Sequence, residues 1–157
     1  MKKRNIITPL LFIASAEAVG GLSALLAGGY SDFFNTYKEP PLLPPPWVFP
    51  VAWTVLYALM GLSAYWIYKA DAPQSEKKTA FILYSVQLAF NFSWSIIFFR
   101  FEALWLAFAV LLALIAAVAL MMLSFYKIRP AAAYINIPYF IWLLFAGYLN
   151  LATALIN

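Results

Sequence analysis

The chain has 157 residues, of which 66% are hydrophobic and only 10% are charged, and its mean hydropathy is +0.85. Soluble domains average roughly 45–50% apolar and about 25% charged residues, so the composition argues against a soluble enzyme and places the excess apolar surface against lipid. The net charge is +4, and the basic residues lie at the ends of apolar runs, which argues against a nucleic-acid partner. The absence of Cys and His excludes disulfides, zinc sites and Ser-His-Asp triads.

Five apolar segments are each long enough to cross a bilayer as a helix. About 20 residues suffice, and helices are favoured because backbone groups in lipid must bond internally. We therefore expect an all-α membrane protein, a bundle of five transmembrane helices that forms a single domain over residues 1–157. The predicted spans are residues 6–28, 47–68, 81–99, 104–126 and 131–156, and residues 29–46 form the first loop.

Glycine, proline and charged residues mark the breaks between these spans. Gly28 ends the first span, and the prolines of residues 40–46 stiffen the first loop. We expect the second and third loops over residues 71–78 and 100–102. Pro138 lies inside the fifth span, where proline is expected to kink a helix.

Basic residues are distributed unevenly between the two sides of this bundle. Two of them, Lys38 and Arg100, lie in the first and third loops. The other eight lie at the N-terminus and in the second and fourth loops: Lys2, Lys3, Arg4, Lys69, Lys77, Lys78, Lys127 and Arg129. The positive-inside rule therefore places the N-terminus in the cytoplasm and the C-terminus and first loop outside.

The first span has two features with alternative interpretations. Its basic start and the small residues Ala14, Ser15 and Ala16 resemble a cleavable signal peptide, although the apolar run continues through residues 18–27 as a membrane span would. Gly20, Ala24 and Gly28 recur every four residues, a spacing that lets helices approach closely within a subunit or across a dimer.

Glu17 is the only acidic residue in the middle of a predicted span, where a charge is costly. One interpretation is structural, with the carboxyl bonded to Gln87 or Asn91 or placed at a subunit contact. The other interpretation is a proton relay.

Aromatic residues recur along one face of the second span. Phe49, Trp53 and Tyr57 follow i, i+4, i+8 spacing and so share a helix face. Trp47 suits the aromatic belt at a membrane surface, whereas Trp53 and Tyr57 lie deeper and favour a wall facing a cavity.

Polar residues inside the third and fifth spans suggest the other walls of that cavity. Gln87 and Asn91 are one turn apart, and they either bond helices together or line a pocket and bind a ligand. In the fifth span Trp142, Ala146 and Asn150 also share one face, and the small Ala146 leaves space between an indole and an amide.

These motifs, in this order, resemble the translocator protein family, which includes the tryptophan-rich sensory proteins of bacteria and the peripheral-type benzodiazepine receptor. The resemblance runs from about residue 37 to residue 150. It is carried by Pro45, Pro46, Trp47, Val48, Phe49, Trp53 and Tyr57, by Gln87 through Asn91 with Trp94, by Ile97, Phe98 and Phe99, and by Pro138, Tyr139, Trp142, Ala146, Leu149 and Asn150.

The resemblance implies five helices around a ligand cavity, with the first loop as its lid, and a homodimer in a bacterial cell membrane. It implies binding of porphyrins such as protoporphyrin IX and of flat, drug-like ligands of the isoquinoline carboxamide type, with no required cofactor and no metal. The implied pocket residues, together with the aromatic and amide positions noted above, are Trp47, Phe49, Trp53, Tyr57, Gln87, Phe90, Asn91, Trp94, Trp142, Ala146, Leu149 and Asn150.

Three functions remain as alternatives at this stage. The first is a membrane receptor or sensor for porphyrins, because flat ligands stack on indole and phenol rings while a few amides orient them. The second is light-dependent oxidative degradation of bound porphyrin, with Trp53 and Trp142 as redox-active groups. The third is transport of porphyrin or sterol across the membrane.

Overall fold

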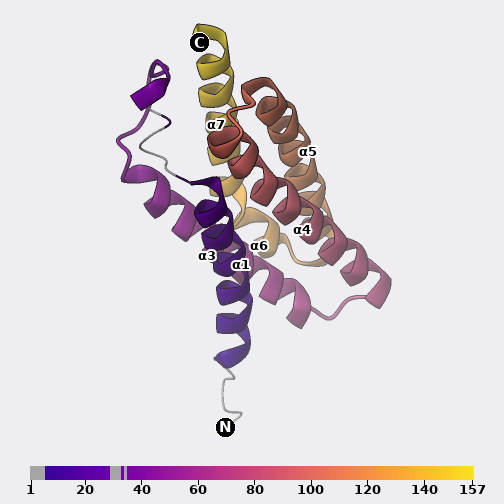
Figure 1. Cartoon of the computed structure of the whole chain (residues 1–157). Helices are drawn as coiled ribbons and strands as arrows, with labels where there is room; N and C mark the ends of the chain where they lie inside the picture. Colours follow the sequence, from indigo (N-terminus) through magenta and orange to yellow (C-terminus); the bar gives the residue numbers. More distant parts are fainter. Residues whose placement is uncertain (1–5, 29–32, 34) are drawn as a thin grey trace.

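The computed structural model describes residues 6–28, 33 and 35–157, and this described part is built from helices. Figure 1 shows α1 crossing α3, with α4 and α5 running side by side, and the start of α1 and the end of α7 lie at opposite ends of the molecule. The elements are α1 (Ile7–Ala27), α3 (Val48–Lys69), α4 (Gln74–Ser95), the π-helical turn η1 (Ile96–Arg100), α5 (Leu104–Ile128), α6 (Pro130–Tyr134) and α7 (Ile137–Ile156).

Five helical segments of the described chain are long and apolar enough to span a membrane, as the sequence predicted. Large apolar side chains on their outer faces stay exposed, for example Leu25, Leu123 and Ile141. An outward-facing apolar surface of this kind suits contact with acyl chains rather than water. The protein is therefore an integral membrane protein. The spanning segments are Ile7–Ala27, Val48–Lys69, Gln74–Arg100, Leu104–Ile128 and Pro130–Ile156.

The predicted second loop is partly wrong, because α4 begins at Gln74 rather than Phe81. The first turns of α4 are polar and have no apolar periodicity, so the hydrophobic pattern did not predict them as helix. Pro73 precedes the helix, and Glu76 lies in its first turn, where a carboxylate interacts favourably with the helix dipole.

The fifth span is interrupted near the predicted kink. α6 ends at Tyr134, and α7 begins at Ile137 with Pro138 in its first turn. The Asn136 side chain at the break donates a hydrogen bond to the Ala132 carbonyl, 2.8 Å away. The proline therefore starts a new helix rather than bending a continuous one, since its ring cannot fit inside a helix.

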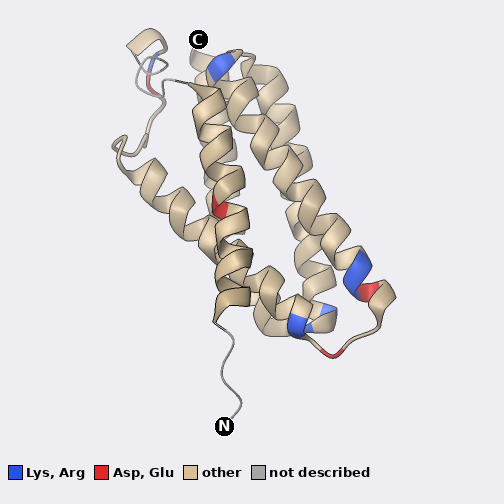
Figure 2. Cartoon of the chain, turned by 60° about the horizontal axis from the view of Figure 1, so that its bottom comes forward, with Lys and Arg blue, Asp and Glu red and all other residues tan. Residues whose placement is uncertain are grey.

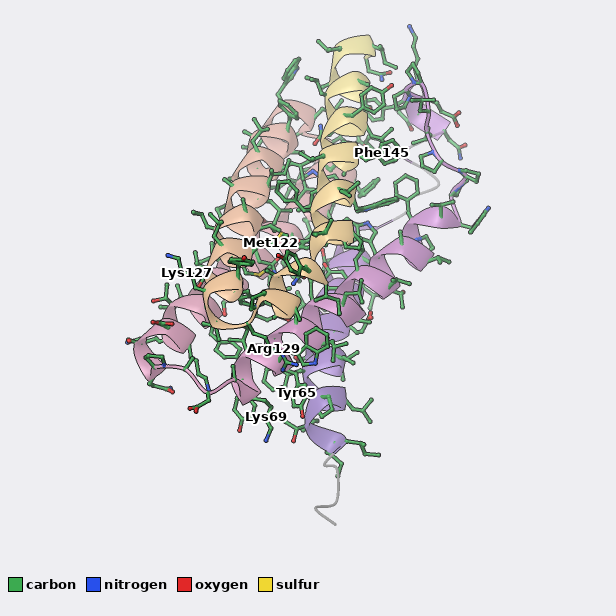
Figure 3. The ribbon with its side chains drawn as sticks, turned by 180° about the vertical axis from the view of Figure 1, so that it is seen from behind. Tyr65, Lys69, Met122, Lys127, Arg129 and Phe145 are labelled. Atoms are coloured by element: carbon green, nitrogen blue, oxygen red, sulfur yellow. The ribbon has the colours of Figure 1, made fainter. Side chains whose placement is uncertain are left out.

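Apart from Glu17 midway along α1, the charged residues of the described helices gather at their ends (Figure 2). Lys69, Lys127 and Arg129 share one end (Figure 3), and the Arg129 guanidinium lies 4.9 Å from the centre of the Trp66 ring. Residues 2–4 lie outside the described residues, so the cytoplasmic placement of the N-terminus stays a prediction.

A glycine brings α3 against the backbone of α1. A Cβ atom at Gly61 would lie 2.5 Å from the Ile13 Cα and 2.6 Å from the Phe12 carbonyl oxygen, closer than real atoms approach. Only glycine permits this contact, as at other close helix crossings in membranes. The crossing positions α1 beside the aromatic face of α3.

Candidate ligand cavity

A cavity of about 400 Å³ lies between α1, the first half of α3 and the junction of α4 with η1. Its volume falls in the range of small-molecule sites, roughly 300–1,000 Å³. The residues that line it are Glu17, Gly20, Gly21, Ala24, Ala27, Gly28, Pro46, Phe49, Pro50, Trp53, Thr54, Tyr57, Trp94, Ser95 and Phe99.

A larger hollow of about 580 Å³ lies on the surface where α3 meets α4. Most of its lining side chains are exposed, and its Lys77 ammonium already donates a hydrogen bond to the Tyr68 carbonyl at 3.0 Å. The smaller cavity is the better candidate site, because buried or half-buried aromatic rings form its walls.

The aromatic face predicted for α3 forms one wall of the cavity. Phe49, Trp53 and Tyr57 all line it, as their one-turn spacing predicted. Trp94 and Phe99 face them from α4 and η1, and their ring centres are 6.1 Å apart. The Trp53 ring centre lies 5.7 Å from that of Tyr57 and 6.4 Å from that of Trp94, which are distances typical of interacting aromatic rings.

Small residues of α1 form the opposite wall. A Cβ atom at Gly20 would overlap the Tyr57 ring, with Cδ2 only 2.5 Å away, whereas nothing lies within 4 Å of a Cβ atom at Gly21. The glycine and alanine stripe therefore serves two purposes within one subunit. Gly20 admits the Tyr57 ring, and Gly21 and Ala24 leave open space in the cavity.

The mouth of the cavity lies between α1 and α3. Gly21 and Ala24 on α1, and Pro50 and Thr54 on α3, line the cavity and are also exposed. All four belong to segments that can span a membrane. The cavity therefore opens sideways, toward the space that acyl chains occupy in a bilayer.

Of the residues that the structure describes, Glu17 is the one acid that lines this cavity, and its side chain is half-buried. It makes no hydrogen bond or ion pair with any residue that the structure describes. The predicted bond to Gln87 or Asn91 is wrong, because both amides have partners on other helices.

A buried chain of hydrogen bonds joins α3, α4 and α7 beside the cavity. The Tyr57 hydroxyl donates to Asn91 Oδ1 at 3.1 Å, and Asn91 Nδ2 donates to the Tyr139 hydroxyl at 2.7 Å. The Tyr139 hydroxyl then donates to Gln87 Oε1 at 2.8 Å. Because Gln87 and Asn91 are 0% and 1% exposed and line no part of the cavity, the structure favours the interpretation that they bond helices together.

A second set of hydrogen bonds links Trp94 of α4 to Asn150 of α7 and Leu104 of α5. The Trp94 indole nitrogen donates to Asn150 Oδ1 at 3.1 Å, and Asn150 Nδ2 donates to the Leu104 carbonyl at 2.9 Å. These bonds join α4, α7 and the start of α5. They also hold the Trp94 ring in a fixed orientation at the cavity wall.

Comparison with known sequences places this arrangement in a family. The profile of the TspO/MBR family matches residues 10–156. This chain belongs to the TspO/MBR family.

Relatives of this TspO/MBR protein come from distant organisms. The tryptophan-rich sensory protein of Cereibacter sphaeroides is 35% identical over 94% of this chain and 90% of its own length. The tryptophan-rich protein TspO of Chlorobaculum tepidum is 29% identical over 98% of both chains. The human translocator protein is 35% identical over 72% of this chain and 68% of its own length.

The predicted pocket residues of this TspO/MBR protein divide into two sets. Four of them line the cavity: Phe49, Trp53, Tyr57 and Trp94. The others lie outside its lining, namely Trp47, Gln87, Phe90, Asn91, Trp142, Ala146, Leu149 and Asn150. The ligand contacts of these eight residues stay predictions. Trp47 lies at the start of α3 and is 67% exposed, which suits a residue of the aromatic belt at a membrane surface.

Trp142 of α7 lies behind Trp53, on the side away from α1. Its ring meets those of Phe49 and Trp53 edge to face, with centres 5.9 and 6.4 Å apart. Its indole nitrogen is buried and has no hydrogen-bond partner in the part of the chain that the structure describes. Trp53 is therefore held between two indoles, Trp94 on the cavity side and Trp142 behind.

The described part of the first loop is fastened to the end of the bundle. The Tyr148 hydroxyl of α7 donates to the Pro41 carbonyl at 2.9 Å. The Tyr37 hydroxyl donates to a Glu102 carboxylate oxygen at 2.9 Å, and this bond raises the pKa of Tyr37 above its usual value. Pro46 at the end of the loop lines the cavity. The role of residues 29–46 as a lid stays a prediction, and residues 29–32 and 34 lie outside the described chain.

Proposed function

We propose that this TspO/MBR protein is a receptor or sensor in a bacterial cell membrane that binds porphyrins, with protoporphyrin IX as the test ligand, and other flat aromatic molecules. The observation that carries the proposal is the cavity of about 400 Å³ with aromatic walls from α3, α4 and η1. A mostly apolar pocket with a few polar groups is the usual design of a small-molecule site. The name of the Cereibacter sphaeroides relative, tryptophan-rich sensory protein, supports a sensor.

Trp53 is the residue best placed to bind a flat ligand. Its ring lines the cavity, and the rings of Tyr57, Tyr139 and Trp142 hold it from the sides and behind, with centres 5.7 to 6.4 Å away. Stacked aromatic pairs contribute about 0.5–1.5 kcal/mol beyond the burial of their surface. The indole N–H of Trp53 makes no hydrogen bond with a described residue, so it can donate one to a carboxyl or carbonyl group of the ligand.

The test is a titration of the purified protein with protoporphyrin IX in the dark, followed by quenching of tryptophan fluorescence. Trp53→Phe keeps an aromatic ring but removes the indole N–H and part of the stacking surface, so we expect binding at least about fivefold weaker, equivalent to about 1 kcal/mol. Trp105→Phe is the matched control, since Trp105 is 59% exposed on α5 and lies outside the cavity lining. Equal affinity in all three proteins would refute the site.

A second variant tests the cavity without removing a tryptophan. Gly21→Leu places a large side chain in the cavity wall, at a position where its Cβ atom meets nothing within 4 Å. We expect this variant to keep its helical circular dichroism and to lose protoporphyrin IX binding. Retained binding would show that the ligand lies elsewhere.

The edge-to-face contact of Trp53 with Trp142 favours a second candidate function, light-dependent oxidative degradation of bound porphyrin. Dissolved oxygen would be the oxidant that accepts electrons from the photoexcited porphyrin. Trp53 lines the cavity and Trp142 lies directly behind it, so the two indoles are placed as redox-active groups beside the ligand. Illumination of the wild type and of a Trp53→Phe, Trp142→Phe double variant, each saturated with protoporphyrin IX, distinguishes the functions. Slower bleaching in the double variant supports degradation, and equal bleaching supports binding alone.

A further inference from the structure

The cavity contains an acidic side chain that pairs with no described residue. Among the described residues, Glu17 is the one acid in its lining, and no Lys or Arg belongs to that lining. The described helix α1 has no basic residue of its own. A carboxylate inside a membrane span is costly unless it is paired or bonded. The charged form of Glu17 is therefore favoured only when a ligand supplies a positively charged partner.

The nearest basic side chain bonded to α1 has a different role. The Arg100 guanidinium donates to the Leu26 carbonyl at 3.1 Å. Leu26 is nine residues along the helix from Glu17, about 13 Å at 1.5 Å per residue. Arg100 therefore caps the end of α1 and does not neutralise Glu17.

The other walls of the cavity also suit a cation. Five aromatic rings line it, those of Phe49, Trp53, Tyr57, Trp94 and Phe99. The face of an aromatic ring attracts a positive charge, by about 0.5–1 kcal/mol at an exposed site and by about 2 kcal/mol or more where water is excluded. A carboxylate beside several aromatic rings, with no competing positive charge, is the chemistry of a site for organic ammonium groups.

The sideways mouth between α1 and α3 restricts the ligand further. Gly21, Ala24, Pro50 and Thr54 surround it within the spanning segments, so a ligand reaches the cavity from the lipid. A small hydrophilic cation would not partition there, whereas a flat aromatic ring system with one protonated nitrogen would.

We propose that the cavity binds lipophilic aromatic cations, with the Glu17 carboxylate as the counter-ion and the aromatic walls enclosing the ring system. The bound pair carries no net charge, and the low dielectric of the site strengthens the attraction between its members. This proposal extends beyond porphyrin binding, because protoporphyrin IX carries carboxyl groups and its affinity does not depend on a cation site. The two proposals share the cavity and can fail separately.

The experiment compares two probes of the same shape. 9-Aminoacridine is protonated at neutral pH, whereas acridine has the same three fused rings and is neutral. Both are titrated against the full chain in nanodiscs of phosphatidylcholine, a lipid with no net charge. We expect the wild type to bind 9-aminoacridine at least about tenfold more tightly than acridine.

Three variants decide whether Glu17 causes the preference. Glu17→Gln keeps the shape of the side chain and removes its charge, so its preference for 9-aminoacridine should fall to about twofold or less. Glu17→Asp keeps the charge and should keep most of the preference. Glu76→Gln removes an exposed acid outside the cavity and should behave as the wild type.

Each outcome supports or overturns the proposal. No preference in the wild type, or an unchanged preference in Glu17→Gln, overturns it. An equal loss of both probes in Glu17→Gln also overturns it, because the residue would then act on the shape of the cavity rather than through its charge. A protein that keeps the cation preference but does not bind protoporphyrin IX supports this proposal and refutes the porphyrin receptor.

Discussion

Removal of one buried hydroxyl group tests whether the polar chain of α3, α4 and α7 stabilises the bundle. The Tyr139 side chain is 0% exposed, accepts a hydrogen bond from Asn91 and donates one to Gln87. Tyr139→Phe leaves one amide donor and one amide acceptor unpaired in the membrane interior. Interhelical hydrogen bonds in membranes contribute about 0.6 kcal/mol on average and up to about 1.7 kcal/mol. Two lost bonds should therefore lower the free energy of unfolding by about 1–3 kcal/mol.

Tyr84→Phe is the matched control for this change. Tyr84 is also a buried tyrosine, 8% exposed, but its hydroxyl oxygen has no hydrogen-bond partner among the described residues. Because an unsatisfied buried polar group costs about 1–3 kcal/mol, its removal should be neutral or stabilising.

Thermal unfolding in one detergent, followed by far-ultraviolet circular dichroism, measures both variants. For a chain of this length 1 kcal/mol corresponds to about 2–4 °C in Tm, so Tyr139→Phe should lower Tm by about 2–12 °C. Tyr84→Phe should leave Tm unchanged or raise it. Equal decreases for the two variants would refute the reasoning, since the loss would then reflect the missing oxygen atom and not its bonds.

Two further predictions concern close packing and the first loop. Gly20→Ala places a methyl group inside the Tyr57 ring and should lower Tm. Gly21→Ala meets open space and should keep or raise Tm, since alanine favours a helix by about 0.5–1 kcal/mol. Thermal unfolding measures both variants, and a harmless Gly20→Ala would contradict the close contact between Gly20 and the Tyr57 ring. Tyr148→Phe removes the donor to Pro41 and should speed amide hydrogen exchange in the first loop with little change in Tm. Unchanged exchange would show that this bond does not hold the loop.

The sequence predicted the number of membrane-spanning segments well and some helix ends poorly. Apolar runs of about 20 residues are a local signal that the membrane itself imposes, so all five spans were found. The first turns of α4, from Gln74 to Lys78, are polar, and no hydrophobic pattern marks them. Pro138 predicted a disturbance in the last span but not that α6 and α7 would be separate helices.

Only those parts of the candidate site that depend on the spacing of residues within one helix could be predicted from the sequence. The shared face of Phe49, Trp53 and Tyr57 follows from helical spacing alone. The position of the cavity does not, because it depends on which helix packs beside that face. The structure places α1 there, so Glu17 and Gly21 line the cavity, although the sequence pattern suggested α7 and Trp142.

The sideways mouth changes what a measured affinity means. A site that opens among acyl chains equilibrates with solute dissolved in the membrane, so its occupancy follows the mole fraction of that solute per lipid and not its aqueous molarity. Two compounds with identical contacts inside the cavity would then differ in apparent potency by the ratio of their partition coefficients. A change in lipid composition would alter the response of the protein without altering any residue in it.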